Sequence, residues 1–387
     1  MALAYVEGVD ALPMAVGPVR VREADASEQD RYERFVVAHP GGSILQSWAW
    51  GALREGQQWQ VTRLLARDGT GRTCGAASVL RRQLPLGGCI LYLPRGPVLD
   101  FHDARVLDAM TGALRRLGVR YHAVLCKIDP YVTPPDGLVA RALAARGFVV
   151  GHRRGHFDGM QPRFNVIVPL AGGEAAVLGR LHGKTRYNIR LAARRGVWTR
   201  QGGREDLPTF HRLLMTTCER NGFAERSLAY FAQVWDALEP QGQIALYLAG
   251  HGSDVLAAAI LFRYGQKAVY AYGASANVHR ELMAPYALQW TMIQSALASG
   301  CRTYDMTGVP KRLDEGEPGY GLYRFKRGFW PEVSEFLGER DLPLHPALYR
   351  IWNVVEPAYW GGQVWVRHAV HGLRAGKTGA APQGAEG

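Results

Sequence analysis

The chain has 387 residues, of which 47% are hydrophobic and 21% are charged, a balance typical of globular proteins that excludes wholesale disorder. A chain of this length favours two domains with a large buried core. It contains no uninterrupted apolar stretch of about twenty residues, so we expect no membrane-spanning helix. The five cysteines are scattered and lack CxxC spacing, which argues against a disulfide framework and against a metal site.

The formal net charge is +12, and only six of the 46 Lys and Arg residues are lysines. This excess favours a polyanionic partner: nucleic acid, a phosphorylated substrate or an anionic membrane surface. A GC-rich genome would produce the same arginine bias, so the charge alone does not decide. The first residues lack the basic start and long apolar stretch of a secretory signal, which predicts a cytoplasmic protein.

Two segments share one pattern of strands and turns. Residues 61–100 and 244–275 each show an apolar strand, a glycine-containing turn, a strand of small residues, a second turn and a third strand. A helix and a further strand follow in each copy, at 103–117 and 123–130 in the first and at 284–298 and 302–309 in the second. The repeated order predicts an α+β fold built by duplication.

A stretch rich in Gly, His and Arg at residues 151–162 separates the two copies. We therefore expect a first domain over residues 1–160 and a second over residues 161–344. Residues 345–375 are expected to pack back on the first domain. The small-residue tail at 376–387 is expected to be disordered.

Two basic segments are candidates for contact with a polyanion. Between Lys184 and Arg195, the side chains of Arg186, Arg190 and Arg194 recur every four residues and would form one helical stripe. No acidic residue interrupts this stripe, which favours phosphate contact over a solvated face. The spacing of residues 363–374 predicts a basic amphipathic helix with tryptophan, suited either to a membrane interface or to packing on the domain.

The segment FKRGFW places Lys326 between Phe325 and Phe329 in a chain where lysine is scarce. Such a lysine could stabilise an oxyanion or hold a phosphate, or its ammonium could simply extend from a strand edge into water. GxSxG, HExxH, Walker A and GxGxxG motifs are absent from the sequence. The stretches after the central strands also lack the glycines that would hold the pyrophosphate of coenzyme A. We therefore expect an acyl donor other than coenzyme A, no cofactor and no metal.

Eight motifs in order give the chain a family resemblance: ILQSWAWGALR, YLPRGPVLD, KTRYNIRLAARRGV, RNGFAERSLAYF, VYAYGAS, APYALQWTMIQSALASG, YDMTGV and LYRFKRGF. Together they resemble the Fem-type (FemABX) peptidoglycan bridge-forming aminoacyltransferases, and they cover roughly residues 44–344. The resemblance implies two GNAT-like (acyl-CoA N-acyltransferase-like) domains in tandem. The long coiled-coil arm of some members is not expected, because the sequence has no sustained heptads.

The same resemblance implies a reaction. A small amino acid (glycine, alanine or serine) would pass from aminoacyl-tRNA, as co-substrate, to the side-chain amine of the third residue of a peptidoglycan stem peptide. The acceptor would be UDP-MurNAc-pentapeptide or its lipid-linked form, lipid II, with peripheral contact at the cytoplasmic face of the membrane. Two alternatives remain at this stage: a tRNA-dependent transferase acting on protein N-termini, and a non-catalytic RNA-binding protein.

The resemblance also assigns roles to individual residues. Lys326 matches the lysine at the donor site and Asp129 an acidic residue near the acceptor, so these two are the candidate catalytic residues. The candidate substrate-binding residues are Arg226, Tyr230, Tyr272, Phe325 and Arg54, the last replacing a lysine that some members carry two positions after the tryptophan matched by Trp50. The candidate tRNA-binding residues are Lys184, Arg186, Arg190 and Arg194.

Overall fold

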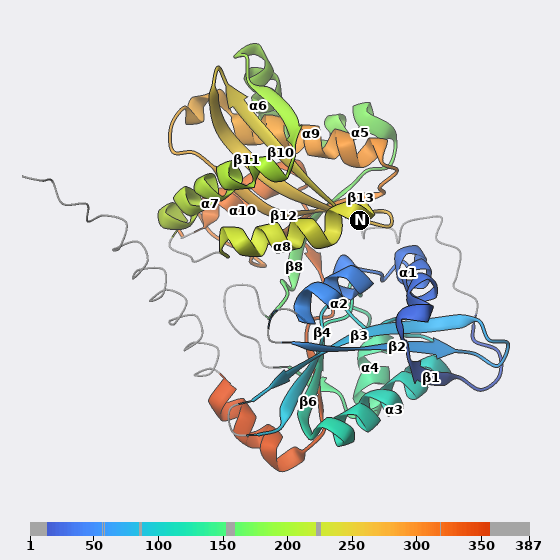
Figure 1. The fold of residues 1–387 in the computed structure, drawn as a ribbon. Coiled ribbons are helices and arrows are strands. Elements are labelled where there is room, and N and C mark those ends of the chain that lie inside the picture. The colour runs from blue at the N-terminus through green and yellow to red at the C-terminus, as the bar shows by residue number, and fades with distance from the viewer. Residues whose placement is uncertain are drawn as a thin grey trace, which may run out of the picture.

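The computed structural model describes residues 14–55, 57, 59–84, 87–151, 159–221, 226–317 and 319–356. Within these residues the strands form an eight-stranded and a seven-stranded sheet, which lie in different halves of the molecule (Figure 1). The first sheet has the order β1-β2-β3-β4-β6-β15-β7, and β5 pairs with β3. Its strands are β1 (Arg20–Glu23), β2 (Gln60–Arg67), β3 (Thr73–Gln83), β4 (Cys89–Leu93), β5 (Val98–Leu99), β6 (Ala123–Ile128), β7 (Val149–Val150) and β15 (Arg340–Pro343).

The second sheet has the order β14-β8-β13-β12-β11-β10-β9. Its strands are β8 (Phe164–Pro169), β9 (Trp198–Gly202), β10 (Ile244–His251), β11 (Asp254–Tyr264), β12 (Lys267–Ser275), β13 (Thr303–Gly308) and β14 (Ser334–Glu335). The predicted repeat is therefore present: each sheet holds an antiparallel meander followed by a helix and a parallel strand.

The helices form three groups. α3 (Ala104–Tyr121) and α4 (Gly137–Ala145) pack on the outer face of the first sheet. The outer face of the second sheet carries α5 (Gly173–Arg180), α6 (Gly183–Arg194), α9 (Ala284–Ala298) and α10 (Tyr320–Phe329). Between the sheets lie α1 (Gln29–Ala38), α2 (Trp48–Glu55), α7 (Leu207–Asn221) and α8 (Leu228–Leu238).

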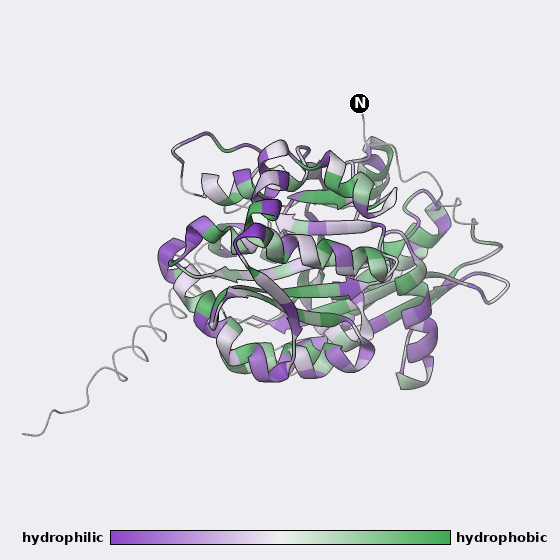
Figure 2. Ribbon diagram, turned by 90° about the horizontal axis from the view of Figure 1, so that it is seen from above, coloured by the Kyte–Doolittle hydropathy of each residue, from purple (hydrophilic) through white to green (hydrophobic). Residues whose placement is uncertain are grey.

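The two halves share a hydrophobic core. Leu65 of β2 and Ile260 of β11 point into the core between the sheets, whereas their neighbours Leu64 and Leu261 point into the two outer cores. Both faces are buried over residues 64–66 of β2 and over residues 256–262 of β11, and these two stretches are accordingly apolar. Figure 2 accordingly shows hydrophobic residues concentrated in the strands at the centre of the molecule.

The parallel strand pairs differ between the sheets. In the first sheet β4 pairs with β6 along its whole length, from Cys89 to Leu93. In the second sheet β12 pairs with β13 only as far as Val269 opposite Asp305. Beyond that point β12 continues beside β11 while β13 pairs with β8, and its register shifts between Asp305 and Gly308. The second sheet therefore opens at its centre, and the first does not.

The chain returns to the first sheet earlier than expected. β15, which lies inside the predicted second domain of residues 161–344, pairs with β6 of the first sheet. Residues 346–356 are helical, and the buried Trp352 packs there against Trp59 and Tyr92. The predicted amphipathic helix at 363–374, the tail at 376–387 and residues 152–158 of the predicted boundary lie outside the described residues.

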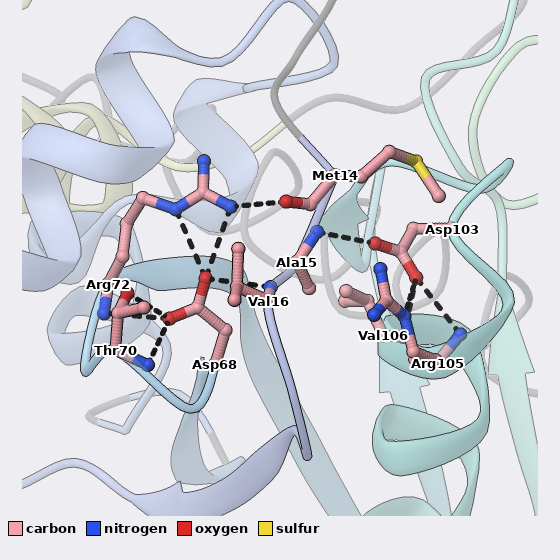
Figure 3. Close-up of polar contacts among 9 residues, drawn as sticks. All are labelled: Met14, Ala15, Val16, Asp68, Thr70, Arg72, Asp103, Arg105 and Val106. Carbon is pink, nitrogen blue, oxygen red and sulfur yellow. Dashed lines mark hydrogen bonds and ion pairs between the residues drawn. The ribbon is translucent and has the colours of Figure 1, made fainter.

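The start of the described chain is held by side chains of the first sheet and of α3 (Figure 3). Asp103 caps α3 and also accepts the backbone N–H of Ala15 at 2.7 Å. Asp68 accepts the N–H of Val16 at 3.2 Å and pairs with the guanidinium of Arg72 at 3.1 Å. This segment is thereby fixed to the face of the first sheet that carries α3.

Candidate active site between the two sheets

Lys326 lies on α10 beside the point where the second sheet opens, and it is only 4% exposed. Its Nζ donates to the carbonyl of Gly308 at 2.9 Å and to Thr307 Oγ1 at 3.2 Å. Burial lowers the pKa of Lys326 to about 8, and the nearby carboxylate of Asp305 opposes that decrease. The end of β13 therefore holds a buried ammonium group that titrates close to neutral pH.

Asp129 follows β6 at the corresponding end of the first sheet and is 2% exposed. One carboxylate oxygen accepts the hydroxyl of Tyr92 at 2.8 Å, and the other accepts the backbone N–H of Arg95. Burial raises the pKa of Asp129 to about 7, and the positive charge of Arg95 opposes the rise. A carboxyl group with this pKa exchanges a proton readily at neutral pH, as a general base requires.

Arg95 connects the two sheets. Its Nη2 donates to the carbonyl of Pro162 at 2.6 Å, and its guanidinium stacks on the ring of Phe336 at 4.1 Å. The same cation acts electrostatically on both Asp129 and Asp305. The buried acid of the first sheet and the buried acid of the second thus share one arginine.

The predicted substrate-binding residues Arg54, Arg226, Tyr230 and Tyr272 lie together, although they come from distant parts of the chain. The hydroxyls of Tyr230 on α8 and Tyr272 on β12 are 3.3 Å apart, and the Arg226 guanidinium lies 5.1 Å from the Tyr230 ring centroid. Arg54 on α2 interacts electrostatically with all three and with Tyr92. Burial lowers the pKa of Arg54. The guanidinium groups of Arg54 and Arg226 both lie near the phenols of Tyr230 and Tyr272.

Electrostatic interactions and a hydrogen bond connect Arg54, Arg226, Tyr230 and Tyr272, which we call the arginine–tyrosine group, to Asp129. Tyr92 is the link, because it interacts with Arg54 on one side and donates a hydrogen bond to Asp129 on the other. Phe325, next to Lys326, lies on the side of the second sheet and packs against Tyr286 with ring centroids 5.0 Å apart. Phe325 therefore belongs to an aromatic wall of the second core, where its ring contacts Tyr286 and Phe329.

The basic stripe on α6 divides into two kinds of residue. Lys184, Arg190 and Arg194 are exposed. Arg186 instead donates to the carbonyls of Gly179, at 2.8 Å, and Leu181, so it satisfies backbone groups at the end of α5. α6 begins beside the helix that carries Lys326, because the N–H of His182 donates to the carbonyl of Gly328 on α10 at 2.9 Å.

Each half of the molecule is a mixed sheet with one parallel strand pair and a helix crossing between its members. Lys326 lies where β12 and β13 separate. Two mixed sheets, one of them with such an opening between its parallel strands, define an acyltransferase-like fold. The prediction of an α+β protein with two GNAT-like domains in tandem is confirmed. The described residues contain no antiparallel pair of long helices that would form a coiled-coil arm.

The FemAB family model matches residues 27–251 and 242–357, so this chain belongs to the FemAB family. It is 28% identical over 391 residues to a lipid II:glycine glycyltransferase of Staphylococcus saprophyticus, covering 84% of this chain and 94% of that protein. The Staphylococcus aureus protein of the same name is 28% identical over 400 residues with the same coverage. The crystal structure of FemX matches with a TM-score of 0.80 and 26% identity, over 86% of this chain and 99% of that chain.

The sequence alone assigned no role to three residues of this site: Tyr92, Arg95 and Asp305. Arg95 and Asp305 lie within motifs that carried the family resemblance, YLPRGPVLD and YDMTGV, but no role followed from the motifs themselves. The signal available for Asp305 was an acidic residue between Tyr304 and Met306 in a predicted strand, because an ionised group is rarely buried without partners.

Proposed function

We propose that this protein is an aminoacyltransferase that moves a small amino acid, glycine first, from aminoacyl-tRNA to the side-chain amine of the third stem-peptide residue of lipid II. Membership of the FemAB family and relatives named as lipid II:glycine glycyltransferases support glycine and the lipid-linked acceptor. The single observation that carries the proposal is the juxtaposition of Lys326, Asp305, Arg95 and Asp129 across the two sheets.

The acceptor is assigned to the arginine–tyrosine group. Two guanidinium groups, of Arg54 and Arg226, suit a diphosphate because arginine binds phosphate oxygens in a fixed geometry. The paired phenols of Tyr230 and Tyr272 supply further hydrogen-bond donors beside them. From this group the set of contacts leads through Tyr92 to Asp129, so a stem peptide extending along it would bring its amine to the buried acid.

The donor is assigned to the opening of the second sheet. The parted ends of β12 and β13 leave backbone groups without a strand partner on that side, and Lys326 lies at this point. The exposed side chains of Lys184, Arg190 and Arg194 on the neighbouring α6 would contact the phosphates of the tRNA acceptor stem. No cofactor is needed, because the ester of aminoacyl-tRNA is already activated.

In the proposed reaction the acceptor amine attacks the carbonyl carbon of the aminoacyl ester. A carbon–nitrogen bond forms, the bond from carbon to the ribose oxygen breaks, and the proton lost by the amine passes through Asp129 to the departing ribose oxygen. The ammonium of Lys326 stabilises the negative carbonyl oxygen of the intermediate, a contact worth about 3 kcal/mol in other acyl transfers. Alignment of the two substrates supplies a further contribution of several kcal/mol.

A lipid-linked acceptor also calls for contact with the membrane. No described helix has the length and apolar character to cross a bilayer. The helical residues 346–356 bury Trp352 but leave Leu348, Ile351 and Val354 at least 40% exposed. We assign this outer face to peripheral contact with the cytoplasmic leaflet, where the protein's positive charge would be attracted to anionic lipids.

The test is a transfer assay with purified protein and tRNA charged with glycine, alanine or serine. Acceptors are lipid II in vesicles, UDP-MurNAc-pentapeptide and a peptide with a free N-terminus, with products identified by mass spectrometry. We expect glycyl addition to the third stem residue of lipid II. Transfer to the peptide alone would support action on protein N-termini, and binding of uncharged tRNA without transfer to any acceptor would support an RNA-binding role.

A further inference from the structure

We infer that Asp305 is a positioning residue that holds Lys326 in place and in its charged form at the opening of the second sheet. The inference rests on the proposed function, because it assigns to Lys326 the role of the cation at the donor carbonyl. It concerns a residue on β13 that itself would touch neither substrate. Its basis is a set of contacts around the end of β13.

The carboxylate of Asp305 is itself fixed on both oxygens. Nδ2 of Asn165, on the neighbouring β8, donates to them at 3.0 and 2.9 Å, and the backbone N–H of Thr307 donates to one of them at 2.7 Å. Asp305 is 5% exposed. Since these neighbours all act as donors, the site is built for an ionised carboxylate.

Thr307 transmits this arrangement to Lys326. Its backbone lies in the left-handed region with φ of +62°, which is rare for a β-branched residue and energetically unfavourable. The N–H of Thr307 donates to Asp305, while its hydroxyl and the next carbonyl, that of Gly308, accept from Lys326. The unfavourable turn thus lets one short segment bind the carboxylate on one side and the ammonium on the other.

The charges around this pair come from several elements. Asp305 interacts electrostatically with Lys326 of α10, Arg95 of the loop after β4, Lys267 of β12 and the phenol of Tyr131 after β6. From α6, the backbone of His182 contacts α10. Asp305 therefore interacts with three cations, Lys326, Arg95 and Lys267, and shares Arg95 with Asp129.

Burial acts on the two partners in opposite senses. It lowers the pKa of Lys326 to about 8 and that of Lys267 to about 7, and the charge of Asp305 opposes both decreases. Burial also raises the pKa of Asp305, which its donors, Arg95 and Lys326 oppose. Without Asp305, Lys326 would lose its proton at a lower pH, so a smaller fraction of it would carry the ammonium charge near neutrality.

The test is the pH dependence of transfer by the Asp305→Asn variant of the full chain, with glycyl-tRNA and lipid II in single-turnover assays. Activity that requires the ammonium falls as pH rises through the pKa of Lys326. In Asp305→Asn we expect this alkaline decrease to move to lower pH by about one unit. The matched control is Asp103→Asn, which removes another buried carboxylate that binds backbone N–H groups, and its alkaline decrease should stay at the wild-type pH.

A direct measurement accompanies the assay. The chain has six lysines, so titration of ¹³C-labelled lysine side chains by NMR can report the pKa of Lys326, assigned with Lys326→Met. A lower Lys326 pKa in Asp305→Asn supports the inference, and an unchanged pKa with an unchanged alkaline decrease overturns it. If Lys326→Met itself retains full activity, the role proposed for Lys326 fails. This result distinguishes failure of the proposed function from failure of the positioning role of Asp305.

Discussion

The two sheets of this protein follow one plan but treat a buried lysine in opposite ways. Lys127 in the first sheet pairs with Asp341 of β15 and with Glu339 just before that strand, each at 2.9 Å, and these carboxylates raise its pKa although burial alone would lower it. Lys326 in the second sheet binds a carbonyl and a hydroxyl, and its pKa falls. Two carboxylates balance the positive charge of Lys127. The ammonium of Lys326 donates to two neutral oxygens, and its charge remains to act on another group.

The sheets differ in the same sense. β4 and β6 stay paired to the end, and β15 closes the far side of β6, so the first sheet has no opening beside Lys127. β12 and β13 separate after Asp305, and Lys326 lies there. The two copies of the fold therefore differ: one sheet stays closed and carries Asp129 at its end, and the other opens beside Lys326, where we propose that the donor binds.

Replacing Lys127 with Met should have the largest effect, and the effect should be on stability. The change leaves Glu339 and Asp341 buried without a cation, which costs about 3–5 kcal/mol in comparable buried pairs. Chemical denaturation of this variant measures the loss, and the exposed Lys311→Met serves as the control, with a change within about 0.5 kcal/mol. Equal stability of the two variants would remove the structural role assigned to Lys127.

Replacing Lys326 with Met should affect transfer more than stability. Loss of the cation at the carbonyl oxygen is expected to slow the single-turnover rate by about 10²–10³. Binding of glycyl-tRNA, measured by filter retention, should change far less than the rate. A variant that transfers glycine at the wild-type rate would contradict the difference drawn between the two lysines.

The pH profile should show both halves at work. Asp129 must be deprotonated to accept a proton, so activity is lost as pH falls through its pKa of about 7. Lys326 must be protonated, so activity is lost as pH rises through its pKa of about 8. We expect a narrow optimum between these values and loss of the acidic decrease in Asp129→Asn, whose residual rate should be low. A broad, flat profile would count against both assignments.

The smallest effects are expected on α6. Arg190→Ala with Arg194→Ala removes two phosphate contacts and should lower the salt dependence of tRNA binding, the slope of log K against log salt, by about 1.5. Arg186→Ala removes hydrogen bonds to the end of α5 and should instead lower stability by about 1 kcal/mol. If Arg186→Ala alters the salt slope as much as the double variant does, Arg186 contacts tRNA too, and the separation of Arg186 from the exposed basic residues of α6 is wrong.

Much of the fold was predictable because its signals are local. The repeated strands and turns identified the duplication, and the predicted helix at 284–298 coincides with α9. The return of the chain through β15 was not predictable, because its residues RDLP have no apolar alternation and the strand is defined only by its partner β6. The predicted second domain, which ends at residue 344, therefore includes a strand that belongs to the first sheet.

The site was predictable in part for the same reason. Lys326 stands in the motif LYRFKRGF, and the family resemblance assigns roles to Asp129, Arg54, Tyr230 and Tyr272. Arg95 could not be placed, since its importance lies in contacts with Pro162 and Phe336, far away in the chain. Nor does sequence spacing reveal that Arg186 turns back to cap α5.

The most direct measurement is a crystal structure of the protein with a short RNA carrying glycine at its 3′ end through a stable amide in place of the ester. The account places the glycyl carbonyl oxygen within hydrogen-bond distance of Lys326 Nζ, between the parted ends of β12 and β13, with the RNA phosphates near Arg190 and Arg194. Glycine bound beside β4 and β6 of the first sheet, or away from Lys326, would contradict it.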